Sequence, residues 1–461
     1  MLDQAVERRQ DELIKAVQEM IALRSEEGPP GAGAPFGEAV GRALDRALAI
    51  AAGLGFKTVN LDGYAGYAEY GSGDDYIAVL GHLDVVPAGD GWTYPPYGGE
   101  IHAGRLYGRG AADDKGPIMA ALYGLAAVKE LGLPLSKRVR IIFGTNEETG
   151  CRDLDYYAAR EPAPAAGFTP DACFPVIHAE KGNCEFTLTR QVSPADAPLQ
   201  LLSLHSGERV NIVPARAEAV LLAREPQRLL AKCAAFRAAG RGDLTAVPGA
   251  DGQMVISACG KAAHASLPQQ GSNAAMLLAD FLSGCPLPPD LGAFFRAISR
   301  LVGRETDGGS LGIACQDAES GGLTLNAGLL RFDGNTASLT CDVRFPVSCS
   351  GERLLAAVRR AAAGSGLELA DCSCGKPLYF SPRHPLVATL QAVYAAVTGD
   401  AAKPLAIGGG TYAKHLANTV AFGPQFPGQP DVCHQADEYI ALDDLRLCAK
   451  LYARAIYAVA K

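Results

Sequence analysis

The sequence predicts an α/β protein whose chain is interrupted by an inserted α+β segment. Up to about residue 181, short apolar or β-branched runs alternate with helical periodicity, which is typical of a mostly parallel sheet covered by helices. Strands then dominate until about residue 380, after which the alternating pattern returns. At 461 residues the chain is long enough for two cores. We therefore expect one discontinuous domain, residues 1–184 and 381–461, and one inserted domain, residues 185–380.

Composition and charge exclude several classes of protein. The chain is 48% hydrophobic and 20% charged, as in ordinary globular proteins, and its net charge of −8 argues against a nucleic-acid-binding surface. No uncharged apolar stretch of about 18 residues is present to cross a membrane, and the charged N-terminus lacks the apolar core of a signal peptide. Thirteen scattered cysteines, none in a zinc-finger spacing, predict reduced thiols. We expect a cytoplasmic protein.

The first domain opens with two amphipathic helices, near residues 2–24 and 36–54, joined by a loop rich in glycine and proline. Gly55 follows the second helix at the C′ position, where glycine is favoured. Three strands are predicted next, near Lys57–Asn60, Gly66–Tyr70 and Tyr76–Leu80.

The third of these strands runs directly into His82 and Asp84. In an extended chain, side chains two residues apart share a face, and a histidine that binds a metal usually donates its second ring N–H to such a group. Ligands of α/β sheets bind at this end of the strands. The pair therefore predicts a metal ligand and the acid that orients it; the alternative is a pair that only caps a turn.

Two adjacent acids, Asp113 and Asp114, come immediately before a predicted helix. Pro117 suits the first position of that helix, and the apolar residues after it form one stripe. Aspartate is also favoured at helix N-caps, but two adjacent acids exceed what a cap needs. The glycines nearby match no phosphate-binding fingerprint.

Three further acidic residues lie next to predicted strands. The β-branched strand Arg138–Thr145 leads into Glu147 and Glu148, and Asp171 precedes an apolar run, Ala172–Ile177, that predicts another strand. A solvated turn is the alternative for the glutamates. Because carboxylates recur next to the predicted strands, the pattern favours one site to which these residues contribute together.

The inserted segment and the final segment are assigned from the same kinds of pattern. The inserted segment predicts strands near Glu185–Thr189, Leu201–His205, Ala217–Ala223, Met254–Cys259 and Ser338–Arg344, and helices near Pro226–Ala239, Asn273–Leu282 and Gly351–Ala363. The final segment predicts a helix at Pro385–Val397, a glycine-rich stretch Ile407–Thr411, a strand at Thr419–Phe422, and a helix at Leu442–Val459 after His434.

The polar residues at strand ends form one chemically coherent set: His82, Asp84, Asp113, Glu147, Glu148, Asp171 and His434. Imidazole and carboxylate donors without cysteine suit Zn²⁺, Mn²⁺ or Co²⁺. Two metals about 3.5–4 Å apart need a bridging carboxylate, and together they activate water and polarise a carbonyl. One further carboxylate must stay off the metals to carry the proton.

The motifs that hold these residues resemble the M20 family of di-metal peptidases over essentially the full chain, and most of all its PepV-type and carnosinase-like dipeptidases. The matching stretches are Gly-His-Leu-Asp-Val-Val-Pro, Gly-Arg-Gly-Ala-Ala-Asp-Asp-Lys-Gly, Asn-Glu-Glu-Thr-Gly and Pro-Asp-Ala-Cys-Phe-Pro, followed by His434. The resemblance implies a phosphorylase/hydrolase-like catalytic domain with a mostly parallel mixed sheet, residues 1–184 and 381–461, and an inserted α+β lid domain, residues 185–380.

The resemblance also implies a role for each residue of the set. His82 and Asp171 would hold one metal, Glu148 and His434 the other, and Asp113 would bridge them; zinc is expected first, with manganese or cobalt as alternatives. Asp84 would orient His82. Glu147 would be the general base that deprotonates the water and passes the proton to the leaving amine.

In the lid, the resemblance implies residues that contact the substrate. His264 would polarise the scissile carbonyl, with Asn211 beside it. Arg344 would pair with a free substrate carboxylate, helped by Gly409, Gly410 and Thr411. The alternatives are a structural histidine and a charge pair between Asp342 and Arg344 within the sheet.

These inferences predict a metallopeptidase that cleaves dipeptides with free N- and C-termini. The alternatives are an M20 deacylase or carboxypeptidase that acts on N-acyl amino acids, and a catalytically silent binding protein on the same scaffold. Glycoside hydrolysis needs no paired histidines, and no Gly-x-Ser-x-Gly elbow is present. We expect a small peptide as the partner, no nucleic acid or membrane, and a monomer, with a homodimer as the alternative.

Overall fold

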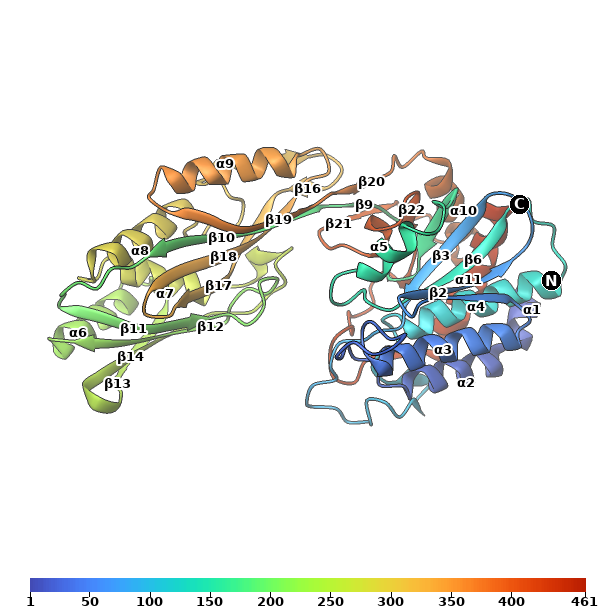
Figure 1. Cartoon of the computed structure of the whole chain (residues 1–461), viewed down its shortest axis with the longest axis horizontal. Coiled ribbons are helices and arrows are strands. Elements are labelled where there is room, and N and C mark those ends of the chain that lie inside the picture. Colours follow the sequence, from blue (N-terminus) through green and yellow to red (C-terminus); the bar gives the residue numbers. More distant parts are fainter. The chain divides into compact units, whose positions relative to one another are not determined.

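The computed structural model describes residues 1–461, which divide into two compact units (Figure 1). Unit 1 consists of Met1–His178, Tyr379–Ala406 and Gly410–Lys461. Unit 2 consists of Ala179–Leu378 together with the short stretch Ile407–Gly409. Unit 1 is thus built from three separate parts of the sequence, and unit 2 is mainly one insertion.

The main sheet of unit 1 has four parallel strands at its centre. In spatial order these are β6 (Arg138–Gly144), β3 (Tyr76–His82), β7 (Ala166–Thr169) and β22 (Thr419–Ala421). β2 (Ala65–Tyr70) and β1 (Lys57–Leu61) extend one side and β9 (Ile177–Glu180) the other, all antiparallel to their neighbours. The predicted fold class, a mostly parallel mixed sheet with helices, is confirmed.

Both faces of this sheet are buried at its centre. Successive side chains of a strand point to opposite faces, so neighbouring residues enter different cores. Ile77 and Val79 of β3 enter the larger core, whereas Tyr76, Ala78 and Leu80 enter a smaller one. The larger core is covered by α1 (Leu2–Arg8), α2 (Gln10–Ile21), α3 (Glu38–Gly53), α4 (Lys115–Glu130), α10 (Pro385–Thr398) and α11 (Leu442–Ala460). The smaller core is covered by α5 (Arg152–Ala158) and the 3₁₀ turn η3 (Tyr412–Lys414).

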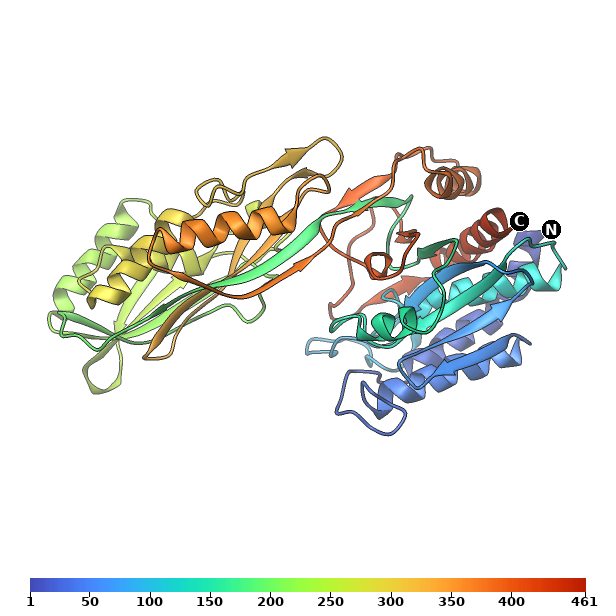
Figure 2. The ribbon, with the colours of Figure 1, turned by 45° about the horizontal axis from the view of Figure 1, so that its top comes forward.

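The two termini lie close together in unit 1, as Figure 2 shows. Ion pairs from Arg454 to Asp3 and from Lys450 to Glu7 join α11 to α1. The last helix also packs along α4, so the final segment of the chain completes the core that the first segment begins.

Unit 2 contains one antiparallel sheet of eight strands with four helices packed on it. In spatial order the strands are β13 (Asp243–Pro248), β14 (Gln253–Cys259), β12 (Arg216–Ala223), β11 (Leu199–Ser206), β17 (Thr324–Phe332), β18 (Thr336–Phe345), β10 (Gly182–Gln191) and β19 (Glu368–Gly375). The helices are α6 (Pro226–Ala238), α7 (Ala274–Ser283), α8 (Pro289–Leu301) and α9 (Gly351–Ala363). Alternating side chains of β12, β14 and β18 form the core with these helices.

The remaining elements are short. A three-stranded sheet joins β4 (Glu100–His102), β5 (Arg105–Tyr107) and β24 (Tyr439–Ala441), and β8 (Ala172–Cys173) pairs with β23 (Pro424–Gln425). The others are β15 (Gln316–Asp317), β16 (Gly321–Gly322), β20 (Leu378–Tyr379), β21 (Leu405–Ile407), η1 (Ala250–Gly252) and η2 (Pro268–Gln270). No helix is both long and apolar enough to cross a membrane.

Several local predictions are wrong. The first predicted helix is two helices that meet at Arg9, and Pro117 occupies the third position of α4, not the first. The strand predicted over Ala172–Ile177 is interrupted at Pro175, which has no N–H to donate to a ladder, so only its two ends belong to strands. The sequence patterns also missed β17 and α8.

The prediction of reduced thiols differs from the structure at four of the thirteen cysteines. The structure pairs Cys184 with Cys374 and Cys315 with Cys349. Cys184 and Cys374 are 190 residues apart in sequence but lie directly opposite each other in the register of β10 and β19. Sequence spacing therefore carried no sign of this pair.

Candidate metal centre

Three parallel strands deliver candidate residues to the same edge of the main sheet. β3 ends at His82, whose register partner is Gly144, the last residue of the neighbouring β6. Glu147 and Glu148 follow β6, and Asp171 follows β7 on the other side of β3. Because parallel strands place their carboxyl ends at one edge, residues far apart in sequence converge there.

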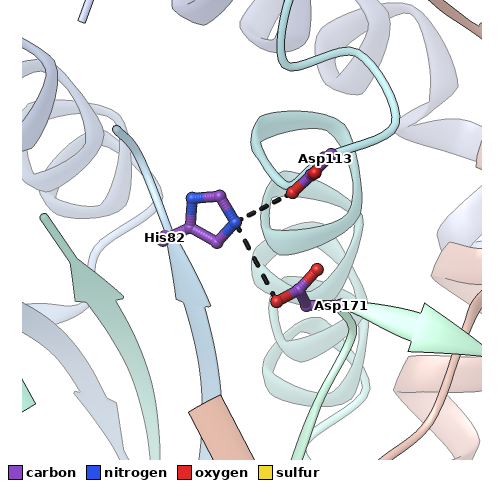
Figure 3. Close-up of side chains that lie close together, drawn as sticks. All are labelled: His82, Asp113 and Asp171. Atoms are coloured by element: carbon purple, nitrogen blue, oxygen red, sulfur yellow. Dashed lines mark hydrogen bonds and ion pairs between the residues drawn. The ribbon is translucent and has the colours of Figure 1, made fainter. Parts of the chain in front are cut away.

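The first donor group consists of His82, Asp113 and Asp171, shown in Figure 3. Nε2 of His82 lies 2.9 Å from Oδ1 of Asp113 and 3.9 Å from Oδ2 of Asp171. His82 stands at the end of β3, and Asp113 lies in the loop before α4. One ligand atom from each residue lies within 4.8 Å of the others, so a single ion could be held by all three.

The second donor group consists of Asp113, Glu148 and His434. Nε2 of His434 lies 3.0 Å from Oδ2 of Asp113 and 3.1 Å from Oε1 of Glu148. The two oxygens of Asp113 therefore face two different histidines, one in each group. Two imidazoles and three carboxylates at these separations fit a pair of Zn²⁺, Mn²⁺ or Co²⁺ ions that share one carboxylate.

Asp84 connects the two groups through hydrogen bonds. Its backbone carbonyl oxygen lies 3.0 Å from Nδ1 of His82, closer than its carboxylate at 3.5 Å, so the carbonyl accepts the ring N–H and leaves Nε2 toward the ligand site. The Asp84 carboxylate instead accepts the backbone N–H groups of Glu147 and Glu148, at 3.2 and 3.1 Å. It therefore fixes the turn that carries both glutamates.

The crowded carboxylates change the proton affinity of Glu147. Burial, and then the neighbouring charges of Glu148 and Asp113, raise the pKa of Glu147 to about 8. Burial alone would lower the pKa of His82, but its hydrogen bonds to Asp113 and Asp84 outweigh burial and raise that pKa well above its usual value. Glu147 belongs to neither donor group. Its raised pKa suits a residue that takes up a proton near neutral pH.

Sequence reasoning missed Asp153 and Tyr412, which are hydrogen-bonded to each other; Asp153 also holds the two residues that precede Glu147. The buried Asp153 carboxylate accepts the backbone N–H groups of Thr145, at 2.6 Å, and Asn146, at 3.1 Å, and the hydroxyl of Tyr412 also donates to it. Burial raises the pKa of Asp153 to about 6. No spacing rule could have found this pair, because its members are 259 residues apart.

In unit 2, the structure places His264 beside Asn211. Residues Ile212 and His264 form a β-bridge, and the N–H of Ala265 donates to the carbonyl of Asn211 at 2.9 Å. The backbone N–H of Ser266 lies 3.2 Å from Nδ1 of His264, and its hydroxyl lies 2.7 Å from the same atom. Because a backbone N–H can only donate, Nδ1 is the acceptor and the ring proton of neutral His264 is on Nε2.

Gly408, in the part of the glycine-rich stretch that belongs to unit 2, lies against the same loop. A side chain at Gly408 would place its Cβ only 2.7 Å from Cβ of Ser266, so glycine permits this close approach. Gly409 continues the stretch in unit 2, whereas Gly410 and Thr411 belong to unit 1, where the Thr411 hydroxyl accepts the N–H of Ala413.

Arg344 makes the charge pair that the sequence offered as an alternative. Its Nε and Nη2 donate to the two oxygens of Asp342, each at 2.7 Å. Both residues point away from the core, because the core of unit 2 takes the odd-numbered neighbours Cys341, Val343 and Phe345 of β18. Two donor atoms of Arg344 are thus committed to a neighbour on its own strand.

Comparison with known proteins gives a consistent result. Residues 78–458 match the peptidase family M20/M25/M40. The chain is 43% identical to YtjP of Bacillus subtilis (strain 168), which is named as a dipeptidase, over 460 residues that cover 98% of each protein. It is 34% identical over 461 residues to the Beta-Ala-Xaa dipeptidase of Lactobacillus delbrueckii subsp. lactis, covering 99% of this chain and 97% of that one.

Solved structures share the fold at low sequence identity. Human carnosine dipeptidase 1 aligns with a TM-score of 0.57 and 16% identity, covering 100% of this chain and 98% of that one. The aminopeptidase PepT of Bacillus cereus aligns with a TM-score of 0.57 and 15% identity, covering 98% and 99%. These alignments support the two-part architecture of an α/β sheet and a separate antiparallel sheet.

Proposed function

The chain belongs to the M20/M25/M40 family of peptidases, and from this premise we propose that it is a di-metal dipeptidase that cleaves dipeptides with free N- and C-termini. The observation that carries the proposal is the position of Asp113, whose two carboxylate oxygens face His82 and His434 separately. A single-metal enzyme would have no need for a carboxylate shared between two complete donor groups.

His82 and Asp171 would hold one ion, Glu148 and His434 the other, and Asp113 would bridge them. When bound, the ions would activate the attacking water and polarise the scissile carbonyl. The imidazole and carboxylate donors suit zinc first, with manganese or cobalt as alternatives. Asp84 orients His82 through its backbone carbonyl and holds the Glu147–Glu148 turn through its carboxylate.

Glu147 is the proposed general base. It lies next to a ligand, Glu148, but belongs to neither donor group, so its carboxylate is left to accept the proton of the water and pass it to the leaving amine. Adjacent residues on a turn direct their side chains apart, so one can ligate while the other faces the substrate.

The division of labour between the domains is also part of the proposal: a catalytic domain, residues 1–184 and 381–461, and a lid, residues 185–380. In the lid, His264 would donate its Nε2–H to the scissile carbonyl, with Asn211 beside it. Arg344 would use the edge of its guanidinium that Asp342 leaves to bind the substrate carboxylate, together with Gly409, Gly410 and Thr411.

The competing enzyme is a deacylase or carboxypeptidase of the same family that acts on N-acyl amino acids. It differs in lacking a partner for a free substrate amine, a role that Asp171 could fill with an outer oxygen. The names of the B. subtilis and L. delbrueckii relatives favour the dipeptidase. A silent binding protein is disfavoured because all seven positions of the set carry chemically competent residues.

The decisive experiment is hydrolysis of a dipeptide panel against N-acetyl amino acids by metal-stripped protein resupplied with Zn²⁺, Mn²⁺ or Co²⁺. We expect metal-dependent cleavage of the free-amine dipeptides. Glu147→Gln should lower kcat by about 10²–10⁴-fold while metal content stays unchanged. Cleavage of the acylated compounds alone would replace the proposal with the deacylase, and metal binding without any turnover would replace it with the binding protein.

The proposed setting is the cytoplasm and the proposed assembly is a monomer, as the composition and the size of the lid predict. Light scattering coupled to size exclusion tests the assembly, with a mass near 48.0 kDa expected for a monomer.

A further inference from the structure

A completely buried ion pair, Arg109 with Glu438, lies beside the metal centre and has no role in the proposed chemistry. Both side chains are at most 2% exposed, and Nη1 of Arg109 lies 2.5 Å from Oε2 of Glu438. Burying two charges is costly unless further hydrogen bonds satisfy their remaining atoms. Nε of Arg109 has no hydrogen-bond partner, and the groups bound by the other atoms of this pair indicate what the pair does.

Glu438 binds the loop that carries the bridging carboxylate. Its Oε1 accepts the backbone N–H groups of Gly110 at 3.0 Å, Ala112 at 3.0 Å and Asp113 at 3.2 Å. Its own backbone carbonyl accepts the N–H of Gly108 at 2.9 Å, where β24 and β5 pair. The N–H of Asp113 itself is thus fixed by a residue four positions after His434.

Arg109 binds the two other segments that carry ligands. Its Nη1 donates to the carbonyl of Gln435 at 3.3 Å, one residue after His434. Its Nη2 donates to the carbonyls of Pro87 at 3.3 Å and Ala88 at 3.2 Å, in the segment that follows His82 and Asp84. One guanidinium therefore holds two loops that are more than 300 residues apart in sequence.

We propose that Arg109 and Glu438 are positioning residues that set the relative places of His82, Asp113 and His434. The pair binds backbone atoms of all three ligand segments and belongs to neither donor group, so it acts on the metals only through those segments. A bridging carboxylate must present one oxygen to each ion, which makes its backbone position critical. The inference rests on the proposed metal site, although the hydrogen bonds themselves do not.

Trp92 provides a local reporter for this pair. It is the only tryptophan in the chain, and the guanidinium carbon of Arg109 lies 5.3 Å from the centre of its ring. Its indole N–H donates to Ala88, whose carbonyl also accepts from Arg109. A change in the Arg109–Glu438 pair should therefore shift the intrinsic tryptophan emission, whereas a distant substitution should not.

The test uses Glu438→Gln and Arg109→Lys in the full-length chain, with Glu69→Gln as the matched control. Glu69 also accepts from buried arginine, Arg140, in the same unit but contacts no ligand segment. Glu438→Gln replaces one acceptor oxygen with an amide donor that would face Arg109 or the N–H groups of the loop. Arg109→Lys removes the planar guanidinium, so a single ammonium group could not bind both loops at once. Each protein is examined metal-free by amide exchange of residues 108–113 and by Trp92 emission, and then by metal-binding calorimetry.

We expect both variants to exchange the 108–113 amides faster, shift the Trp92 emission, and bind metal about 10–100-fold more weakly than the unsubstituted protein, in line with other residues that orient ligands. Glu69→Gln should lower thermal stability without any of these changes. Unchanged exchange and metal affinity in either folded variant would overturn the inference, as would an equal loss of affinity in Glu69→Gln. If the unsubstituted protein bound no metal, the proposed function would fail instead, and faster amide exchange in the variants would still support the positioning contacts.

Discussion

The candidate residues of the two units are held in very different ways. In unit 1, buried charged groups fix two of the metal-ligand segments directly: Asp84 and Asp153 hold the Glu147–Glu148 turn, and Glu438 holds the Asp113 loop. In unit 2, His264 lies on a loop joined to its surroundings by a short β-bridge and by Ser266. Preorganised ligands favour metal binding, so substitutions in unit 1 should change metal content, and those in unit 2 should change turnover.

The largest effect is expected at Asp113. Asp113→Asn offers only one oxygen where two ions need one each, so both ions should be lost and activity should fall by roughly 10³-fold or more. His434→Ala should remove only the ion of the second group. Metal content measured by plasma mass spectrometry separates the two outcomes, and equal metal loss in both variants would argue against a shared carboxylate.

The next effect tests the other side of the comparison. His264→Ala should lower kcat by about 10²–10³-fold, as expected when a donor to the developing oxyanion is removed, with metal content unchanged. Steady-state kinetics and metal analysis on the same preparation provide the measurement. Loss of metal in this variant would mean that unit 2 also shapes the metal centre.

A smaller effect is expected at Asp84. Asp84→Asn replaces one acceptor oxygen with an amide that faces the N–H groups of Glu147 or Glu148, which should loosen the turn. Metal affinity should fall by about 10–100-fold. Competition with a chromophoric chelator measures it. If affinity were unchanged while kcat fell, the carboxylate would serve Glu147 alone and not the ligands.

The smallest effect concerns acid stability in unit 2. Burial alone would raise the pKa of Asp317, but hydrogen bonds from the Ser320 and Ser348 N–H groups outweigh it and lower that pKa to about 2. A lowered pKa stabilises the fold above the unfolded value of about 3.9, and this contribution disappears as the pH falls toward 2.

Asp317→Asn should therefore be slightly less stable at neutral pH and should lose less stability than the unsubstituted protein between about pH 4 and pH 2. Because Asp317 is only partly buried and its charge is screened by solvent, the difference should be small. Urea denaturation at a series of pH values measures it; parallel pH profiles for the two proteins would contradict the assignment.

Much of the architecture was predictable because it follows from short-range patterns. The strand at Tyr76–Leu80 and the helices at Gly351–Ala363 and Leu442–Val459 agree closely with β3, α9 and α11. The family and the peptidase class inferred from the motifs are confirmed. The residue roles stay predictions, because they concern ligands and chemistry that no comparison tests. The predicted domain boundaries, residues 1–184 with 381–461 and residues 185–380, also stay predictions.

The sequence by itself determined the residue types of the candidate set: histidines and carboxylates, with no cysteine among them. Only the tertiary structure decided how they combine. It placed His434 within hydrogen-bond distance of Glu148, 286 residues earlier, and it selected Glu438 as the partner of Asp113, 325 residues earlier. The physical reason is that helical and strand periodicity is local, whereas a buried carboxylate finds its donors wherever the folded chain brings unpaired N–H groups.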